Sequence, residues 1–391
     1  MSHNVKTGLE NLVRSPIDIP DTARIGLLAN PASLDRNFVH ASVWLDRCYP
    51  NQLTALFSPQ HGFYGEKQDN MIESDHIEHP VFKIPVFSLY SETRKPTQNM
   101  FDLIDILFID LQDVGTRVYT FIYTISYCLE MAASMNKRVI ILDRPNPLGG
   151  VVTEGNVLDP EWSSFVGRFP VPMRHGLTVA EISTYFNEQF NIRCALEVIP
   201  MAGWKRNFYF HDTGLPWTAP SPNLPTVTSS YVYPGQVIYE GTQVSEGRGT
   251  TMPFEQFGAP YINPEPIIEQ LTPHLEGVVL RQVCFQPTSG KFSDQMCRGL
   301  FIHITDMDAY RPYLLSLRSL QAIICQHNDR FEFKAPPYEY EFDRLPMDLI
   351  LGSKELREQL QQMVSIDELK KSWEPGLQAY NRKIESVFIY E

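Results

Sequence analysis

Two glutamates in short polar segments could carry acid–base chemistry. Glu66 ends the segment HGFYGE, and Glu92 lies in the segment SLYSETRKP. The aromatic residues before Glu66 could exclude water from one side, which would raise its pKa and suit a general acid. Arg94 and Lys95 would keep Glu92 charged, as a base or nucleophile requires. Either glutamate could instead be an exposed loop residue paired with a neighbouring cation.

A second group of polar side chains lies in DILFIDLQDVGTRVY, residues 105–119. Asp110 and Asp113 could accept hydrogen bonds from the hydroxyls of a sugar, and Arg117 could donate in a fork to an anion. An internal Asp–Arg pair that fixes the loop explains these residues equally well. Tyr90 and Tyr119 offer aromatic faces for a sugar ring, although ordinary core packing also accounts for such tyrosines.

Further candidates lie in DRPNPLGG, MRHGL, PSPN and EGRGTT. The glycines of EGRGTT would let the backbone approach a ligand, and its arginine could bind a carboxylate. The histidines are expected to form hydrogen bonds, because no HExxH or DxDxDG motif supports a metal site. No GxSxG motif indicates a serine hydrolase. These segments add the candidates Asn146, His175, Asn223, Glu246, Arg248 and Thr250, and HGFYGE adds His61.

Most of the polar segments follow apolar runs that read as buried strands. The runs cover residues 24–29, 53–57, 85–89, 106–109 and 137–142, and they alternate with helix-like segments such as 118–135. This alternation predicts a parallel, Rossmann-like sheet, in which ligands bind outside the carboxyl ends of the strands. No GxGxxG motif follows the first strand, so NAD is not predicted.

The pattern changes after about residue 260. A helix over 264–271, strands over 278–285 and 300–304, and a helix over 311–325 indicate a smaller α+β domain. A chain of 391 residues also suits two domains. We therefore predict an α/β protein with a Rossmann-like catalytic domain over residues 1–250. A smaller α+β domain over residues 251–391 is expected to close the cleft.

Net charge and hydropathy exclude some classes of binding partner. The net charge of −13 argues against nucleic acid or an anionic membrane as the main partner, and no apolar run approaches a membrane-spanning length. The N-terminal MSHNVKTGLENLV lacks the pattern of a signal peptide, which predicts a cytoplasmic location unless a leader has been removed. The six cysteines contain no CxxC pair and are expected to be reduced thiols.

Several segments together resemble one family. FSPQHGFYGE, FSLYSETRKP, DLQDVGTRVYTFIYT, DRPNPLGG, MRHGLTVAE, DTGLPWTAPSPNLPT and YEGTQVSEGRGTTMPFEQFGAP are similar to motifs of the NamZ-type exo-β-N-acetylmuramidases of bacterial peptidoglycan recycling. The resemblance implies a glycosidase that removes terminal N-acetylmuramic acid from the non-reducing end of peptidoglycan fragments, without a cofactor. It also implies a Rossmann-like domain and a smaller C-terminal domain with the active site between them.

The resemblance suggests roles for the candidates, with paired carboxylates cleaving the glycosidic bond. Glu66 would be the acid/base, and Glu92 the second carboxylate, with Asp113 as its rival. The family generally has Glu where this chain has Gln60, and it varies at Glu92. The lactyl carboxylate of the sugar would meet Arg117, Arg248 or His175. Hydroxyl and acetamido groups would meet Asp110, Asn146, Asn223 and Thr250.

Two other functions fit the same residues. A non-catalytic sugar-binding protein could use the same cleft, particularly with glutamine at position 60. A nucleotide-sugar or phosphosugar enzyme could be built on a Rossmann-like fold. The expected partner is a small carbohydrate, either a muropeptide or a disaccharide fragment. The sequence predicts neither the oligomeric state nor the stereochemical outcome.

Overall fold

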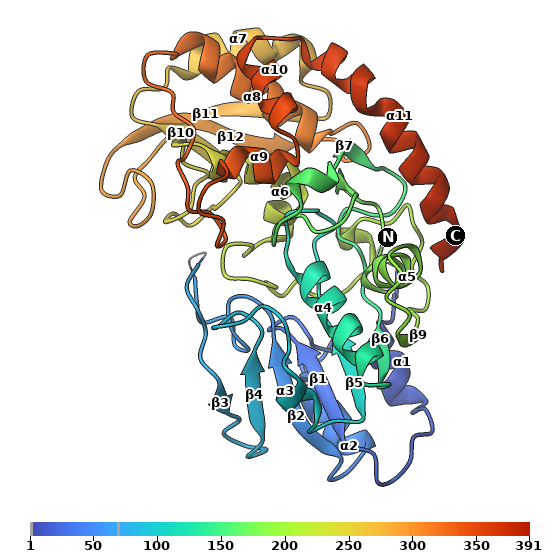
Figure 1. The fold of residues 1–391 in the computed structure, drawn as a ribbon. Coiled ribbons are helices and arrows are strands. Elements are labelled where there is room, and N and C mark those ends of the chain that lie inside the picture. The colour runs from blue at the N-terminus through green and yellow to red at the C-terminus, as the bar shows by residue number, and fades with distance from the viewer. Residues whose placement is uncertain (1–2, 69–70) are drawn as a thin grey trace.

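A seven-stranded sheet forms the core of the N-terminal part of the chain (Figure 1). The structure, a computed structural model, describes residues 3–68 and 71–391. The strand order is β3-β4-β2-β1-β5-β6-β9, and every neighbouring pair is parallel except β3 with β4. The strands are β1 (Ile25–Ala29), β2 (Leu53–Ser58), β3 (Ile77–Glu78), β4 (Pro85–Ser88), β5 (Ile106–Asp110), β6 (Arg138–Leu142) and β9 (Ala195–Ile199). The predicted α/β class and the five predicted strands of its sheet are confirmed.

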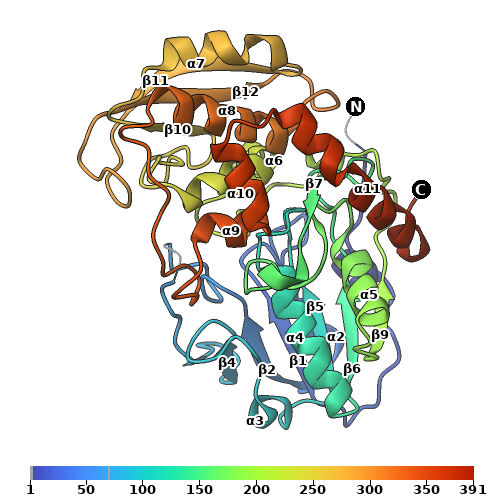
Figure 2. The ribbon, with the colours of Figure 1, turned by 45° about the horizontal axis from the view of Figure 1, so that its top comes forward.

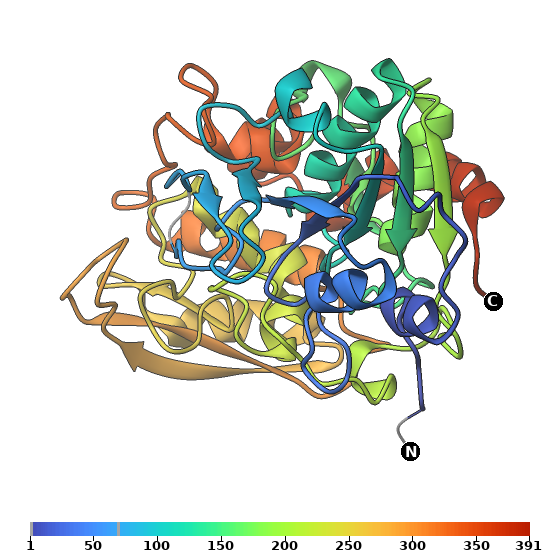
Figure 3. The ribbon, with the colours of Figure 1, turned by 90° about the horizontal axis from the view of Figure 1, so that it is seen from below.

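Helices cover both faces of this sheet, as Figure 3 shows. One face carries α1 (Gly8–Arg14) and α2 (Ala41–Cys48). The other carries α3 (Gln98–Phe101), α4 (Phe121–Ser134) and α5 (Val179–Gln189). Because both faces are covered, all five residues of β5 are buried, which explains why its sequence reads as a continuous apolar run.

Alternating side chains of the central strands enter two separate cores. Ile106 and Phe108 pack with Leu9 of α1, whereas Leu107 and Ile109 pack on the face of α4. This is the two-residue period of a strand. The register fixes the carboxyl ends of β1, β2, β4, β5 and β6 at one edge of the sheet.

The loops beyond that edge contact one another. Thr120, after β5, donates from Oγ1 to Oε1 of Gln60, after β2, at 2.9 Å. Gln112, also after β5, donates to the backbone carbonyl of Pro145, after β6, at 2.9 Å. The predicted gathering of polar loops at one rim is therefore confirmed for these three loops.

A smaller antiparallel sheet organises the C-terminal part (Figure 2). Its order is β10-β12-β11, with β10 (Gln256–Ala259), β11 (Val278–Phe285) and β12 (Cys297–Ile304). A hairpin of β7 (Glu154–Val157) and β8 (Pro172–Arg174) lies apart from both sheets. The helices of this part are α6 (Val227–Gln236), α7 (Pro264–Leu271), α8 (Pro312–Gln326), α9 (Pro346–Leu351), α10 (Lys354–Gln361) and α11 (Ile366–Ile384).

Two segments join the halves. The helix α11 runs back from the C-terminal part to the N-terminal part, where the hydroxyl of Tyr390 donates to Asp143 at 2.6 Å. The loop between α8 and α9 extends from the smaller sheet towards the loops of the N-terminal domain, as Figures 1 and 2 show. The predicted domain division at residue 250 stays a prediction. No helix in residues 3–68 and 71–391 is long and apolar enough to cross a membrane.

Candidate active site

A small buried pocket lies where the loop between α8 and α9 meets the rim of the large sheet. Its volume is about 30 Å³, which is room for about two water molecules. Both halves of the chain contribute polar side chains. Those lining the pocket are Gln60, His61, Tyr119, Thr120, Ser221, Asn223, Tyr233, Glu240, Arg248, Tyr338 and Glu339.

Glu339 is a buried acid from the α8–α9 loop, with 4% of its surface exposed. Tyr90 donates its hydroxyl to Oε2, and Gln60 donates from Nε2 to Oε1 at 3.2 Å. Burial raises the pKa of Glu339 to about 7, and the neighbouring charge of Glu240 acts in the same direction. The carboxyl group therefore holds a proton for part of the time at neutral pH, as a general acid must.

Glu240 is the second carboxylate of the pocket and is equally buried. It lies in the 3-10 helix η3 (Val237–Gly241). Arg248 donates from Nη2 to its Oε1 at 2.7 Å, and Tyr338 donates its hydroxyl to Oε2 at 2.7 Å. Both oxygens of Glu240 thus act as acceptors, one of them from a cation, whereas the two side chains that donate to the carboxyl group of Glu339 are uncharged.

A third carboxylate, Glu246, also contacts Arg248. Glu246 is 3.4 Å from Nε of Arg248, and Lys291 donates from Nζ to Glu246 at 2.6 Å. Burial acts to raise the pKa of Glu246, but the charges of Lys291 and Arg248 outweigh it and lower that pKa. Glu240, Arg248, Glu246 and Lys291 thus form a series of ion pairs in which anions and cations alternate, and its first two members line the pocket.

The backbone that presents Glu339 is strained. Glu339 and Tyr340 have φ angles of 46° and 68°, in the left-handed region that residues with a Cβ avoid. Such a conformation costs on the order of 1 kcal/mol or more per residue and persists where surrounding contacts impose it. Here Tyr338 and Glu341 exchange backbone hydrogen bonds across the turn, and Tyr338 and Glu339 are held by side chains of the pocket.

Gln60 and His61 are fixed by the loops around them. Thr120 donates to Oε1 of Gln60, which leaves the amide nitrogen to face Glu339. Nδ1 of His61 lies 2.7 Å from the carbonyl of Lys67, so this nitrogen carries the proton. Burial lowers the pKa of His61 to about 4, and the charge of Arg248 contributes, so the ring is neutral.

The chain is similar to known proteins over its whole length. Family models for the N-terminal and C-terminal parts of the exo-β-N-acetylmuramidase NamZ match residues 25–228 and 231–390. The chain belongs to this family. It is 39% identical to the peptidoglycan β-N-acetylmuramidase NamZ of Bacillus subtilis (strain 168), over 99% of this chain and 91% of that protein.

Two crystal structures of DUF1343 family proteins from Bacteroides fragilis NCTC 9343 share the fold. One has a TM-score of 0.88 at 31% identity and covers 100% of both chains. The other has a TM-score of 0.75 at 26% identity and covers 99% of both chains. The muramidase family suggested by the sequence motifs is therefore confirmed.

Several predicted binding residues do meet at the pocket. His61, Tyr119, Asn223 and Arg248 line it, and Tyr90 bonds to its acid Glu339. Glu246 contacts Arg248 from behind. These residues come from segments far apart in the sequence, and the rim of the sheet brings them together.

The two glutamates favoured by sequence lie outside the pocket lining. Glu66 is exposed, and its Oε2 accepts the N–H of Tyr64 at 3.2 Å within its own turn, so the predicted shelter by aromatic rings is wrong. Glu92 is also exposed. Arg94, which was expected to pair with Glu92, lies 3.7 Å from Glu73 instead.

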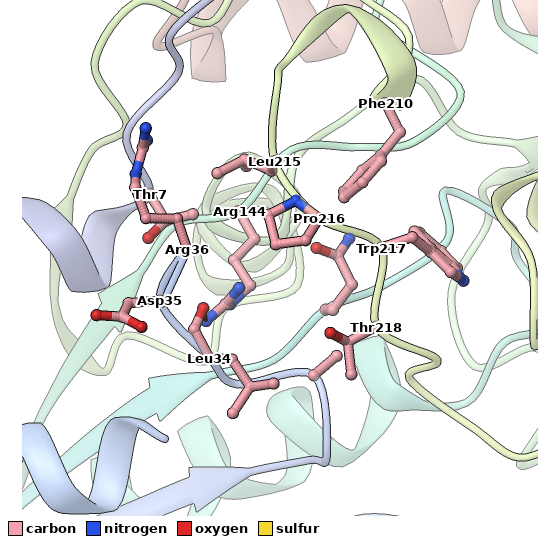
Figure 4. Close-up of a pocket in the computed structure, with 12 residues that line it drawn as sticks. Thr7, Leu34, Asp35, Arg36, Arg144, Phe210, Leu215, Pro216, Trp217 and Thr218 are labelled. Atoms are coloured by element: carbon pink, nitrogen blue, oxygen red, sulfur yellow. Dashed lines mark hydrogen bonds between the residues drawn. The ribbon is translucent and has the colours of Figure 1, made fainter. Parts of the chain in front are cut away.

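Asp110 is held in a buried ion pair with Arg144, which donates from Nε and Nη2 to the two carboxylate oxygens. Arg144 extends across a second small cavity at the rim, where it donates to the carbonyl of Leu34 at 2.9 Å (Figure 4). This pair satisfies both charges and fixes the ends of β5 and β6. The internal Asp–Arg alternative thus describes Asp110 in this structure, and its role in sugar binding stays a prediction.

Arg117 is fully buried and serves the backbone. Its Nη atoms donate to the carbonyls of four residues at 2.7–3.0 Å. These carbonyls belong to Asn156, Val171, Ile350 and Leu351, so the guanidinium connects the β7–β8 hairpin with the end of α9. These contacts account for the buried guanidinium without a ligand, and the role of Arg117 in carboxylate binding stays a prediction.

The remaining predicted residues fix loops behind the pocket. Asp113 accepts from the N–H of Gly115 at 2.7 Å and lies 3.3 Å from Nε2 of His175. Because the N–H of Leu177 donates to Nδ1 of His175, the ring proton is on Nε2 and points to Asp113. Asn146 donates to the carbonyl of Leu177. None of Asp113, Asn146 and His175 lines the pocket.

Thr250 also lies outside the pocket lining. Its hydroxyl donates to the carbonyl of Gly247 and accepts from the amide of Gln256. These bonds hold the EGRGTT turn in shape, and so place Arg248 within reach of Glu240.

The sequence analysis missed the two central acids, Glu339 and Glu240. Glu339 lies in PYEYEF, between two tyrosines, and Glu240 lies in VIYEG, after a tyrosine and before a glycine. The aromatic neighbours that drew attention to Glu66 were therefore present at both positions. Burial, which separates these acids from Glu66, is not visible in such short segments.

Proposed function

We propose that this pocket cleaves the β-glycosidic bond of a terminal N-acetylmuramic acid, with Glu339 as the general acid and Glu240 as the second carboxylate. The observation that carries the assignment is the contrast between the two acids. Burial raises the pKa of Glu339 to about 7, whereas Glu240 accepts hydrogen bonds from Arg248 and Tyr338. Environments that separate two carboxyl groups in this way are typical of acid and base partners in glycosidases.

The chemistry follows from the leaving group. A glycosidic oxygen leaves readily only when it receives a proton, and Glu339 can supply one near neutral pH. Positive charge then develops on the sugar ring, and the carboxylate of Glu240 stabilises it. Water bonds to the anomeric carbon in place of the leaving group and releases a proton, which restores the protonated acid. Tyr90 and Gln60 hold the acid in position through its two oxygens.

The proposed substrate is a muropeptide or disaccharide fragment with N-acetylmuramic acid at its non-reducing end. A pocket of about 30 Å³ is too small for a sugar ring, so the substrate enters by displacing side chains that now fill it. The α8–α9 loop supplies two of the side chains that line the pocket, Tyr338 and the acid Glu339. A cytoplasmic location stays a prediction, which cell fractionation would test.

A chromogenic nitrophenyl β-glycoside of N-acetylmuramic acid tests the proposal. The wild type should release the dye, and Glu240→Gln should lose activity on this substrate and on disaccharides. Glu339→Gln should lose about 100- to 10,000-fold on disaccharides. It should keep more activity on the nitrophenyl compound, which needs little protonation.

Glu66→Gln is a suitable control, because it makes the same chemical change in an exposed loop. It should retain wild-type activity. If Glu66→Gln removes activity and Glu339→Gln does not, the assignment of the acid is refuted. Binding of the glycoside without dye release would favour a non-catalytic sugar-binding protein.

A further inference from the structure

Arg94 lies beside the pocket, and two nitrogen atoms of its guanidinium have no hydrogen-bond partner among the described residues. It follows β4, and its side chain is 16% exposed. Its Cζ lies 4.6 Å from the ring centre of Tyr90 and 3.2 Å from that of Tyr340. Nη1 donates to the carbonyl of Ser91 at 2.7 Å, and the same atom is 3.7 Å from the half-exposed Glu73.

The other edge of this guanidinium has no partner. Among residues 3–68 and 71–391, neither Nε nor Nη2 of Arg94 has a hydrogen-bond partner, and both atoms are buried. Burial also lowers the pKa of Arg94. A buried charged donor without an acceptor is costly, and Nε with Nη2 forms the edge that binds a carboxylate through two parallel bonds. Arg117, by comparison, leaves only its Nε without a partner.

Arg94 is connected to the proposed acid through two tyrosines. Tyr90, whose ring contacts the guanidinium, donates its hydroxyl to Glu339, and Tyr340, over whose ring the guanidinium lies, follows Glu339 in the chain. A sugar whose glycosidic oxygen meets Glu339 would therefore place its neighbouring substituents near Arg94. Arg248, the cation that lines the pocket, is held by Glu240 and Glu246.

N-acetylmuramic acid differs from N-acetylglucosamine by a lactyl ether, which carries the only ionised group of the sugar. We propose that Arg94 determines specificity for N-acetylmuramic acid by binding this lactyl carboxylate through Nε and Nη2. The assignment rests on the proposed function of the pocket. The Tyr340 ring covers the guanidinium plane, so the carboxylate reaches this edge when the α8–α9 loop shifts to admit the sugar.

The test compares the nitrophenyl glycoside of N-acetylmuramic acid with its lactyl methyl ester, which has the same shape without the charge. The wild type should prefer the acid by about 10- to 100-fold in kcat/KM, the range expected for charge-assisted hydrogen bonds. Arg94→Gln should reduce this preference to near unity, and Arg94→Lys should restore part of it. Arg47→Gln is the matched control, because Arg47 stacks on Trp44 at the exposed surface of α2.

Two results would overturn the inference. If Arg94→Gln keeps both the wild-type preference and wild-type rates, another group binds the carboxylate. An equal loss on the acid and the ester would show that Arg94 only positions Tyr90 and Glu339.

If the wild type hydrolyses neither compound, the proposed function fails, and calorimetry with N-acetylmuramic acid and its methyl ester decides about Arg94 separately. Tighter binding of the acid by the wild type, lost in Arg94→Gln, would support the role of Arg94 without hydrolysis. The absence of any preference for the acid in the wild type would overturn it.

Discussion

Replacing Glu339 by glutamine should change stability in a way that depends on pH. The pKa of this carboxyl group is raised from an ordinary 4.5 to about 7 by burial. Between these two values the unfolded chain releases the proton and the native chain keeps it, so the free energy of unfolding falls as the pH rises. Below pH 4.5 the group is protonated in both states, and above pH 7 it is ionised in both, so the loss is confined to this window.

The size of the effect follows from the shift. Raising the pKa from 4.5 to about 7, at about 1.4 kcal/mol per tenfold change in proton affinity, corresponds to roughly 3–4 kcal/mol of stability lost between pH 4.5 and 7. Glutamine is neutral at every pH and fits the same space. Relative to the wild type, the free energy of unfolding of Glu339→Gln should therefore be higher at pH 8 than at pH 4.5 by roughly 3–4 kcal/mol.

Denaturant unfolding of the wild type and of Glu339→Gln at pH 4.5 and pH 8 measures this effect. Other titrating groups change the free energy of unfolding of both proteins equally, so their contributions cancel when the two proteins are compared. The exposed Glu188→Gln on α5 serves as the control and should show no such dependence. The same Glu339→Gln protein should be inactive on disaccharides. A stability difference that is the same at both pH values would refute the raised pKa, and with it the argument for Glu339 as the acid.

Two further outcomes follow from the contacts of neighbouring residues. Gln60→Glu places a second carboxyl group where an amide nitrogen now lies 3.2 Å from Glu339. Since two such groups cannot both ionise readily, the alkaline limb of the activity profile should move to higher pH, and an unmoved limb would contradict this contact. Asp110→Ala should cost about 3–5 kcal/mol in denaturant unfolding, because it leaves Arg144 buried without its anion. The control Asp105→Ala, which breaks an exposed pair, should cost less than about 1 kcal/mol, and equal losses would contradict the argument.

The family motifs identify the muramidase family, yet the acids that stand out in these motifs lie outside the pocket. Glu66 and Glu92 lie in the densest motifs, but both are exposed. Arg117 has the chemistry of an anion receptor and instead donates to four backbone carbonyls. The type of a residue indicates which chemistry its side chain is capable of. The burial and the hydrogen-bond partners of that side chain decide which role it has in the folded protein.

The sequence alone determined the sheet and its polar rim. The strands could be predicted because buried parallel strands need apolar residues on both faces, and the loops because polar residues gather where those strands end. The pocket could not be predicted in the same way. Glu339 lies 279 positions from Gln60 in the chain, and only the packing of the α8–α9 loop against the sheet brings the two together. That packing also buries Glu339 and raises its pKa, so the tertiary structure decides which of many glutamates is suited to act as the acid.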